Sequence, residues 1–219
     1  MTERRGRSFV WVTHLTKLLS GDDQCRYALW FKANHTYDKV VEDQESQDRL
    51  TRWKTDHAAG VEARRRALEL DGYEVLTEAQ TKFNVGTHAT LAGAADLLGL
   101  HREKPEALVV DLKTGKRRDS DYWQVAIYML YLPVALADVL KGRRLTGEVA
   151  YVDGGPPRLL DPSAASKEAA DKVIALMQLT TKKTAPEATP SVSECKFCNI
   201  AECPYRKVGK ENVAKVRGF

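Results

Sequence analysis

The segment from residue 93 to residue 128 carries polar side chains whose types and spacing could do chemistry. It reads GAAD, VVDLKTG and QVAIY at three places, and its polar residues are Asp96, Asp111, Lys113, Gln124 and Tyr128. Hydrolysis of a phosphodiester bond needs a divalent cation that neutralises developing charge and lowers the pKa of an attacking water. One acid, then an acid–x–lysine unit, then Gln-x-x-x-Tyr therefore predicts a metal-dependent site that cuts DNA.

Two carboxylates of this set are expected to hold Mg²⁺, which prefers oxygen ligands. We expect Asp96 and Asp111 to arrive on adjacent strands, and the backbone carbonyl of Leu112 to be a third ligand. Side chains two apart on a strand point the same way, so Asp111 and Lys113 should face one cleft. Lys113 would there polarise or help to deprotonate the water and stabilise the transition state.

Three further residues complete the expected site. Gln124 and Tyr128 lie four apart on an expected helix and therefore share a face, from which they would contact the DNA backbone. His57, on the preceding helix, is an expected additional metal ligand, and its softer imidazole would favour Mn²⁺. Asp96 and Asp111 lie among apolar residues, where an unpaired carboxylate is costly to bury. A cation would compensate them, and a structural salt bridge is the alternative.

Hydrophobic periodicity predicts the elements that position these residues. The pattern is compatible with helices over 8–35, 39–70, 119–140 and 163–180, and with strands over 73–76, 80–85, 89–100, 106–114 and 147–152. The successive strands are expected to form a meander in which 106–113 is buried on both faces. The Pro/Thr/Ser-rich segment 181–194 is expected to be a loop. The order of elements predicts an α/β sandwich around a mixed sheet.

Length and composition are those of an ordinary globular protein. The chain has 219 residues, of which 43% are hydrophobic and 29% charged, enough for one domain with a core. No apolar run approaches the length that crosses a bilayer. The first residues lack a long apolar stretch with a cleavage site, so we expect no secretory signal and a cytoplasmic location.

The formal net charge of +4 favours a nucleic-acid partner only mildly. The basic residues gather in short runs, and phosphate contacts dominate nucleic-acid affinity. These runs are Arg64–Arg66, Lys116–Arg118, Arg143–Arg144 and Lys182–Lys183. Four aromatic residues, Trp11, Trp30, Phe31 and Trp53, have the ring faces that bases stack on, although core packing is the plainer role for most of them.

The four cysteines form one remote residue and one local trio. Cys25 stands alone, and Cys195, Cys198 and Cys203 follow the spacing C-x-x-C-x4-C with Pro204 next. In a cytosolic protein, cysteines in such a pattern are more often metal ligands than disulfides. Four-thiolate zinc, an iron–sulfur cluster and free thiols remain open. Zinc sites are usually built from two local pairs, whereas a trio followed by proline is more typical of an iron–sulfur cluster.

The three motifs GAAD, VVDLKTG and QVAIY resemble motifs II and III of PD-(D/E)XK nucleases, in particular the RecB-like branch. The resemblance implies a three-layer α/β/α restriction-endonuclease-like core with a mixed central sheet, over about residues 50–180. It also implies that His57, in KTDHAAG, completes the metal site. Many relatives have glutamate where this chain has Asp111, and the pattern accepts both.

The cysteines extend the resemblance to nearly the whole chain, residues 1–219, as a single nuclease domain. RecB-like nucleases with an N-terminal cysteine and a C-terminal trio are similar to the Cas-four family and to the AddB nuclease domain, which carry a [4Fe-4S] cluster. The resemblance implies that Cys25, Cys195, Cys198 and Cys203 hold such a cluster as a structural group. Length and residue order resemble the stand-alone Cas-four type, which is also encoded by phages.

Three functions from different classes follow. The first is a Mg²⁺- or Mn²⁺-dependent exonuclease acting on DNA ends, mainly on single strands, in the cytoplasm of a bacterium, an archaeon or a phage-infected host cell. Its implied partners are DNA and either CRISPR-adaptation or phage recombination proteins. We expect no association with a membrane, and the protein could form an oligomer. The second is a non-catalytic DNA-binding or partner-recruiting module. The third is a restriction-type endonuclease, which usually lacks the cysteines.

Overall fold

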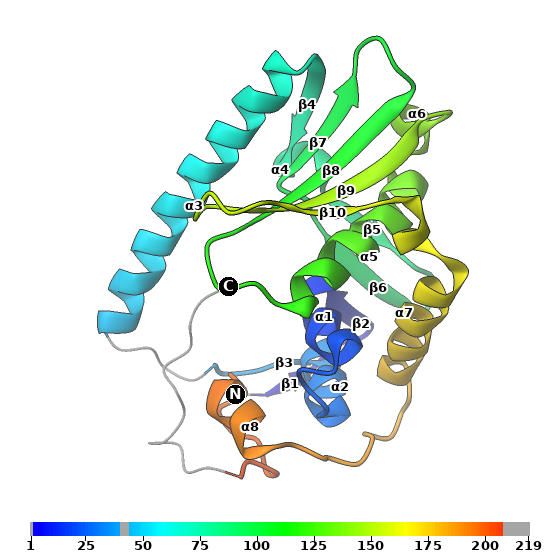
Figure 1. Cartoon of the computed structure of the whole chain (residues 1–219). Coiled ribbons are helices and arrows are strands. Elements are labelled where there is room, and N and C mark those ends of the chain that lie inside the picture. Colours follow the sequence, from blue (N-terminus) through cyan, green and yellow to red (C-terminus); the bar gives the residue numbers. More distant parts are fainter. Residues whose placement is uncertain (1, 40–43, 208–219) are drawn as a thin grey trace.

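The computed structural model describes residues 2–39 and 44–207 (Figure 1). The helices are α1 (Val12–Ser20), α2 (Arg26–Asn34), α3 (Gln44–Leu70), α4 (Glu78–Thr81), α5 (Asp119–Ala135), α6 (Ala137–Leu140), the 3-10 helix η1 (Pro162–Ala165), α7 (Lys167–Thr180) and α8 (Val192–Phe197). The strands are β1 (Glu3–Arg4), β2 (Ser8–Trp11), β3 (His35–Thr36), β4 (Tyr73–Thr77), β5 (Phe83–Val85), β6 (Ala89–Gly93), β7 (Leu97–His101), β8 (Glu106–Lys113), β9 (Arg144–Tyr151) and β10 (Arg158–Leu160). None of the helices in these ranges is long and apolar enough to cross a membrane.

The main sheet has five strands in the order β10-β9-β8-β7-β4. Only β8 and β9 run parallel, with Asp111 opposite Val149, and the other neighbours are antiparallel. A parallel pair needs a crossover connection, which α5 supplies between the two strands. The sheet is therefore mixed, and its strand β8, which carries the Asp-x-Lys unit, is a central strand.

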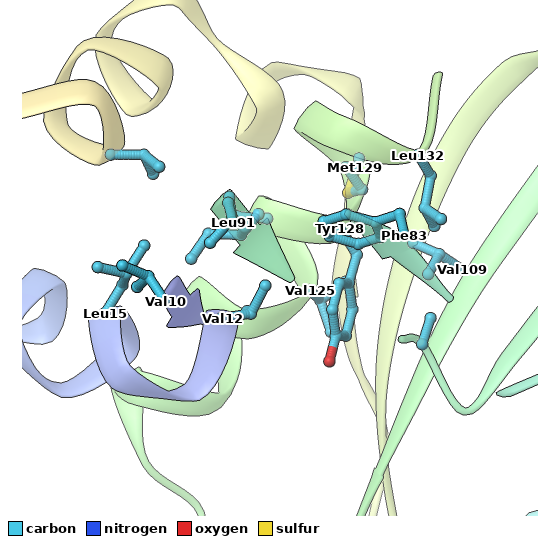
Figure 2. Close-up of a cluster of buried hydrophobic side chains, with 14 of the residues drawn as sticks. Val10, Val12, Leu15, Phe83, Leu91, Val109, Val125, Tyr128, Met129 and Leu132 are labelled. Carbon is cyan, nitrogen blue, oxygen red and sulfur yellow. The ribbon is translucent and has the colours of Figure 1, made fainter. Parts of the chain in front are cut away.

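Helices cover both faces of this sheet (Figure 1). On one face Leu68 of α3 packs in a small apolar cluster with Leu97, Val110, Leu112 and Ala150 of the strands. On the other face α5 buries Val125, Met129 and Leu132 in the larger core, shown in Figure 2. Burying apolar surface on both sides is what makes β8 a continuous run of hydrophobic residues. The predicted α/β class with a mixed, restriction-endonuclease-like core is confirmed.

A second sheet of three strands has the order β2-β6-β5. Its parallel pair β2–β6 joins segments some 80 residues apart, because Ser8 lies opposite Ala89. The buried Ser8 hydroxyl and the Asn34 amide both donate to the carbonyl of Thr180, at 2.9 and 2.8 Å. The beginning of the described chain is thereby held against α7 by buried hydrogen bonds.

Several predicted bounds were wrong. The expected strand 89–100 is two strands, β6 and β7, which belong to different sheets, so Asp96 lies between strands rather than within one. The expected strand 80–85 begins with part of helix α4. The helix predicted over 119–140 is interrupted at Leu136, because Pro133 has no N–H for the carbonyl four residues earlier and weakens the last turn of α5.

The predicted helix 39–70 is confirmed as α3 from Gln44 onward, and it ends one residue before Asp71. Lys39 is described as a bridge to Ile200 instead of a helical residue. The rest of that prediction, residues 40–43, and the part of the predicted domain beyond residue 207 lie outside the described residues.

A buried ion pair fixes α3 to the sheet. The Nε and Nη2 atoms of Arg64 donate to the two carboxylate oxygens of Glu148 on β9, at 2.7 and 2.6 Å. Glu148 is only 3% exposed. One turn towards the start of α3, a Cβ on Gly60 would lie 2.9 Å from the Leu112 and Val152 side chains, so a larger residue would require these side chains or the helix to shift. Both features determine where the preceding turn, with His57, lies.

The first prediction concerns this ion pair. The substitution Arg64→Met leaves the Glu148 carboxylate buried without its partner, and breaking a buried pair costs about 3–5 kcal/mol. Arg66→Met is the matched control, because Arg66 is 71% exposed in its pair with Glu62 and such pairs contribute about 0.2–1 kcal/mol. Urea unfolding of the two variants measures both free energies. Equal losses would contradict a buried Arg64–Glu148 pair.

Candidate metal-dependent active site

Asp111, Lys113 and Gln124 form a closed hydrogen-bonded network at the end of β8. The Lys113 ammonium lies 2.7 Å from Oδ2 of Asp111 and donates to Oε1 of Gln124 at 2.8 Å. The Gln124 amide in turn donates to Oδ1 of Asp111 at 2.9 Å and to the Tyr128 hydroxyl at 3.0 Å. The strand period places the acid and the lysine on one side, and the first turns of α5 place Gln124 opposite them.

Asp96 and His57 lie beside this network. Oδ2 of Asp96 accepts the backbone N–H of Leu112 at 2.7 Å, which ties the segment before β7 to β8. The same oxygen lies 3.3 Å from Nε2 of His57 on α3. The His57 ring stacks on Trp53, one turn earlier on the helix, with 5.1 Å between ring centroids. Elements from three parts of the chain therefore converge on two carboxylates.

The ionisation of these groups follows from burial and from their neighbours. Burial raises the pKa of Asp111 to about 6; Lys113 opposes this rise and Asp96 adds to it. Burial acts to lower the pKa of Lys113, but the charge and hydrogen bond of Asp111, together with the charges of Asp121 and Asp96, outweigh it and the net pKa is raised. The hydrogen bond to Asp96 raises the pKa of His57 against the opposing effect of burial. Lys113 is therefore held as a cation.

The residues fit a divalent cation in the chemistry of their donors. Oδ2 of Asp111 is buried and has no aligned hydrogen-bond donor in the described part of the chain, although the Lys113 ammonium is in contact with it. An oxygen in that condition is available to a metal ion. Within residues 2–39 and 44–207, no three His, Cys, Asp or Glu side chains already stand together as a ligand set. In this arrangement Lys113 supplies the compensating charge that a cation would bring.

A cavity of about 400 Å³ opens over the network. Its lining includes His57, Asp96, Asp111, Leu112, Lys113 and Gln124. Tyr128 is not among the lining residues and is 3% exposed, so the expected contact of Tyr128 with the DNA backbone is wrong. Figure 2 shows its ring among core side chains with the hydroxyl pointing out of the cluster. Tyr128 therefore accepts the hydrogen bond of the Gln124 amide from the core side of Gln124.

The four cysteines line a second, larger cavity of about 1270 Å³. None of them forms a disulfide. The Glu194 carboxylate accepts the backbone N–H groups of Gln24 and Cys25, the latter at 2.8 Å, and of Ser191. One side chain on α8 thus holds Cys25 against the segment that carries the other three cysteines.

Arg206 orders the loop of the cysteine trio. Its guanidinium donates to the carbonyls of Cys195 at 2.8 Å, Cys198 at 3.1 Å and Ile200. Among residues 2–39 and 44–207 the buried Nε–H of Arg206 has no acceptor, and the Lys207 N–H donates to the Cys195 sulfur at 3.3 Å. A buried donor without an acceptor, next to a backbone N–H that donates to a cysteine sulfur, fits an anionic sulfur-ligated group beside the trio.

Sequence reasoning missed Glu194, Arg206 and helix α8. The pattern Ser191-x-x-Glu194 is a capping-box signature that could have identified the start of α8. Arg206 carries no comparable signal, because its partners are main-chain carbonyls that any sequence supplies.

Comparisons with known proteins give one family. No curated protein matches the chain. A solved structure, "Crystal structure of SSO0001", is similar over 94% of this chain and 91% of that chain, with a TM-score of 0.46 and 13% sequence identity. The family model of the PD-(D/E)XK nuclease superfamily matches residues 14–208, which include all the site residues described above. The chain belongs to the PD-(D/E)XK nuclease superfamily.

Proposed function

We propose that this chain is a Mg²⁺- or Mn²⁺-dependent DNA exonuclease of the RecB-like branch, similar to the Cas-four type. It would be a single nuclease domain that acts on ends of single-stranded DNA and contains a structural [4Fe-4S] cluster. The observation that carries the proposal is the buried Asp111–Lys113–Gln124 network beside the Asp96–His57 pair. A binding scaffold would gain nothing from burying an acid beside a partly buried lysine at a cavity.

The metal ligands in this proposal are Asp96, Asp111, His57 and the carbonyl of Leu112. A bound Mg²⁺ or Mn²⁺ supplies charge neutralisation and a more acidic water. The carboxylate of Asp96 is held in place by the Leu112 N–H, and that of Asp111 by the Gln124 amide. Both acids are thus oriented before any ion binds, which reduces the reorganisation needed during reaction.

Lys113 acts as a cation in this mechanism. Its raised pKa keeps the ammonium protonated near Asp111, so it stabilises negative charge on the phosphoryl oxygens instead of removing a proton. Gln124 orients both Lys113 and Asp111, and Tyr128 orients Gln124. His57, whose pKa is raised by Asp96, must lose its proton before its nitrogen can bind a metal ion.

The second prediction tests the nuclease assignment. In Lys113→Ala, cutting of end-labelled linear DNA should fall by about 10²–10³-fold or more, because a preorganised charge at the reacting phosphate is lost. Lys104→Ala is the control, since Lys104 is exposed in the turn before β8. Circular dichroism checks folding, and chelator should stop the parent enzyme. Cutting retained in a folded Lys113→Ala variant would refute the site.

The form of the DNA substrate separates the exonuclease from the alternatives. An exonuclease leaves covalently closed circular DNA intact, whereas a restriction-type endonuclease cuts it. A parent protein that binds DNA but cuts neither form would be a DNA-binding or partner-recruiting module. The position of the label in the products gives the polarity of cutting.

The third prediction concerns pH. As the pH falls through about 6, Asp111 becomes protonated and loses the charge that attracts a cation. Protonation of His57, whose pKa is also raised, acts in the same direction. Activity at a fixed low Mn²⁺ concentration should therefore fall on the acid side, and its midpoint should move to lower pH as Mn²⁺ is raised, because protons and metal compete. A midpoint pH of activity that does not change with Mn²⁺ concentration would contradict the assignment of Asp111 and His57 as metal ligands.

The fourth prediction concerns the cysteines. Protein purified without oxygen should contain about four iron and four sulfide per chain if Cys25, Cys195, Cys198 and Cys203 hold a [4Fe-4S] cluster. Cys198→Ala should lose this iron, and Arg206→Met should lower it because the trio loop loses three hydrogen bonds. Lys207→Ala is the matched control, since only its main chain contacts the cysteines. Stoichiometric zinc in the parent would overturn the cluster.

A further inference from the structure

The larger cavity does not end at the cysteines but continues to the nuclease site. Its lining and that of the 400 Å³ cavity share Thr13, Lys17, Trp53, Lys54 and Arg118. These residues come from α1, α3 and the loop before α5, which lie between the two cavities. The combined space exceeds the roughly 300–1,000 Å³ of a pocket for a small molecule. A polymeric ligand that ends at the reacting phosphate fits these dimensions.

Positive charge gathers along the larger cavity. Its cations are Lys17, Lys32, Lys39, Lys54, Arg117 and Arg118, and its acids are Asp22, Asp23, Asp119 and Glu194. Two of the acids are occupied elsewhere, because Glu194 binds backbone N–H groups and Asp119 pairs with Arg158 at 2.9 Å. The charges of Lys17 and Lys32 act on Asp23, but the lysine ion pairs among the described residues are those of Lys113, Lys167 and Lys172 and include none of the four lysines of the cavity.

A histidine inside this region responds to the accumulated charge. Burial, followed by the charges of Lys32, Lys39 and Arg5, lowers the pKa of His14 to about 3. His14 lines the larger cavity and therefore stays neutral there. Burial is the main cause of this neutrality, but the three charges that add to it belong to the same basic region, and a basic region attracts anions such as phosphates.

Two tryptophans provide ring faces along the same path. Trp11, at the end of β2, is 43% exposed although Val10 before it is buried. Trp53 is half-buried and lines both cavities, with its ring stacked on His57. Trp30 and Phe31, by contrast, are in the core. Aromatic rings in a basic groove stack on bases that are unpaired and unstacked.

We propose that single-stranded DNA lies in the part of the larger cavity that leads from the cysteines to the nuclease site, with its bases on Trp11 and Trp53 and its phosphates against Lys17, Lys32, Lys39 and Lys54, while the proposed cluster takes only the end lined by the cysteines. This proposal rests on the proposed function. It identifies the route by which a single DNA strand reaches the site formed by Asp111, Lys113 and Gln124. A duplex cannot use this route, because its bases are stacked on each other and offer no free face to either tryptophan.

The test measures binding of a fluorescent oligothymidylate of 15 nucleotides by anisotropy, in chelator so that nothing is cut. Trp11→Ala and Trp53→Ala should each weaken binding by between about fivefold and about 150-fold, the range for one base stacked on an aromatic ring. Trp→Phe at the same positions should restore part of the loss. Because metal is absent, an effect of Trp53 on metal ligation by His57 cannot produce this result.

The lysines are tested through the salt dependence of binding. Lys32→Gln and Lys39→Gln should each reduce the slope of log affinity against log salt by about 0.7, the value for one phosphate contact on a single strand. Lys167→Gln on α7 is the matched control, because its exposed ammonium pairs with Asp171 outside both cavities. These variants change exposed or half-exposed residues and should fold normally.

Three results would overturn this route. They are unchanged binding in the tryptophan and lysine variants, duplex binding as tight as single-strand binding and through the same residues, and tighter binding of RNA than of DNA. Failure here is separable from failure of the nuclease assignment. Suppose that Lys113→Ala abolishes cutting while the tryptophan and lysine variants bind DNA like the parent. The nuclease assignment would then hold, and the DNA strand would reach the site by a route other than the larger cavity.

Discussion

The structure depends on one electrostatic constraint, the burial of the Asp111 carboxylate at 3% exposure in the middle of a sheet covered on both faces. A charge in that place is tolerated only if it is paired and hydrogen-bonded. Lys113 supplies the charge, and Gln124 supplies the hydrogen bond. Strand β8, helix α5 and the crossover to β9 must all be in register for this compensation to exist. The site and the fold therefore stabilise each other. The charge of Asp111 can be compensated either by the Lys113 ammonium or by a metal ion.

Helix α3 and the segment around Glu194 perform the same kind of positioning at longer range. Gly60 and the Arg64–Glu148 pair bring α3 against the sheet, which determines where His57 meets Asp96. Glu194 joins Cys25 to α8 in a comparable way. The cavity that contains the basic and aromatic residues is bounded by both of these assemblies. Its shape is thus set by contacts that are themselves outside the reacting centre.

The features that could be predicted from the sequence are those that depend on local periodicity. The two-residue spacing placed Asp111 and Lys113 on one side of a strand, and the four-residue spacing placed Gln124 and Tyr128 on one helical face. Periodicity gives a direction but not a depth, so it could not show that Tyr128 is buried behind Gln124. The small residues after Gly93 carry no signal for a change of sheet, which is why Asp96 was assigned to a strand. Arg206 binds main-chain carbonyls between 6 and 11 residues earlier in an irregular loop, and no residue pattern encodes such contacts.

The carboxylate of Glu194 also has a consequence for the order of events during synthesis. The residues that it joins, Cys25 and Glu194, are 169 positions apart. Ribosomes add about 5–20 residues per second, so Cys25 waits roughly 10–30 s before its counterpart exists. Strand β2 likewise waits for β6 before its edge is covered. The contact between Cys25 and Glu194 therefore cannot form until most of the chain has been synthesised, whereas β2 can pair with β6 earlier.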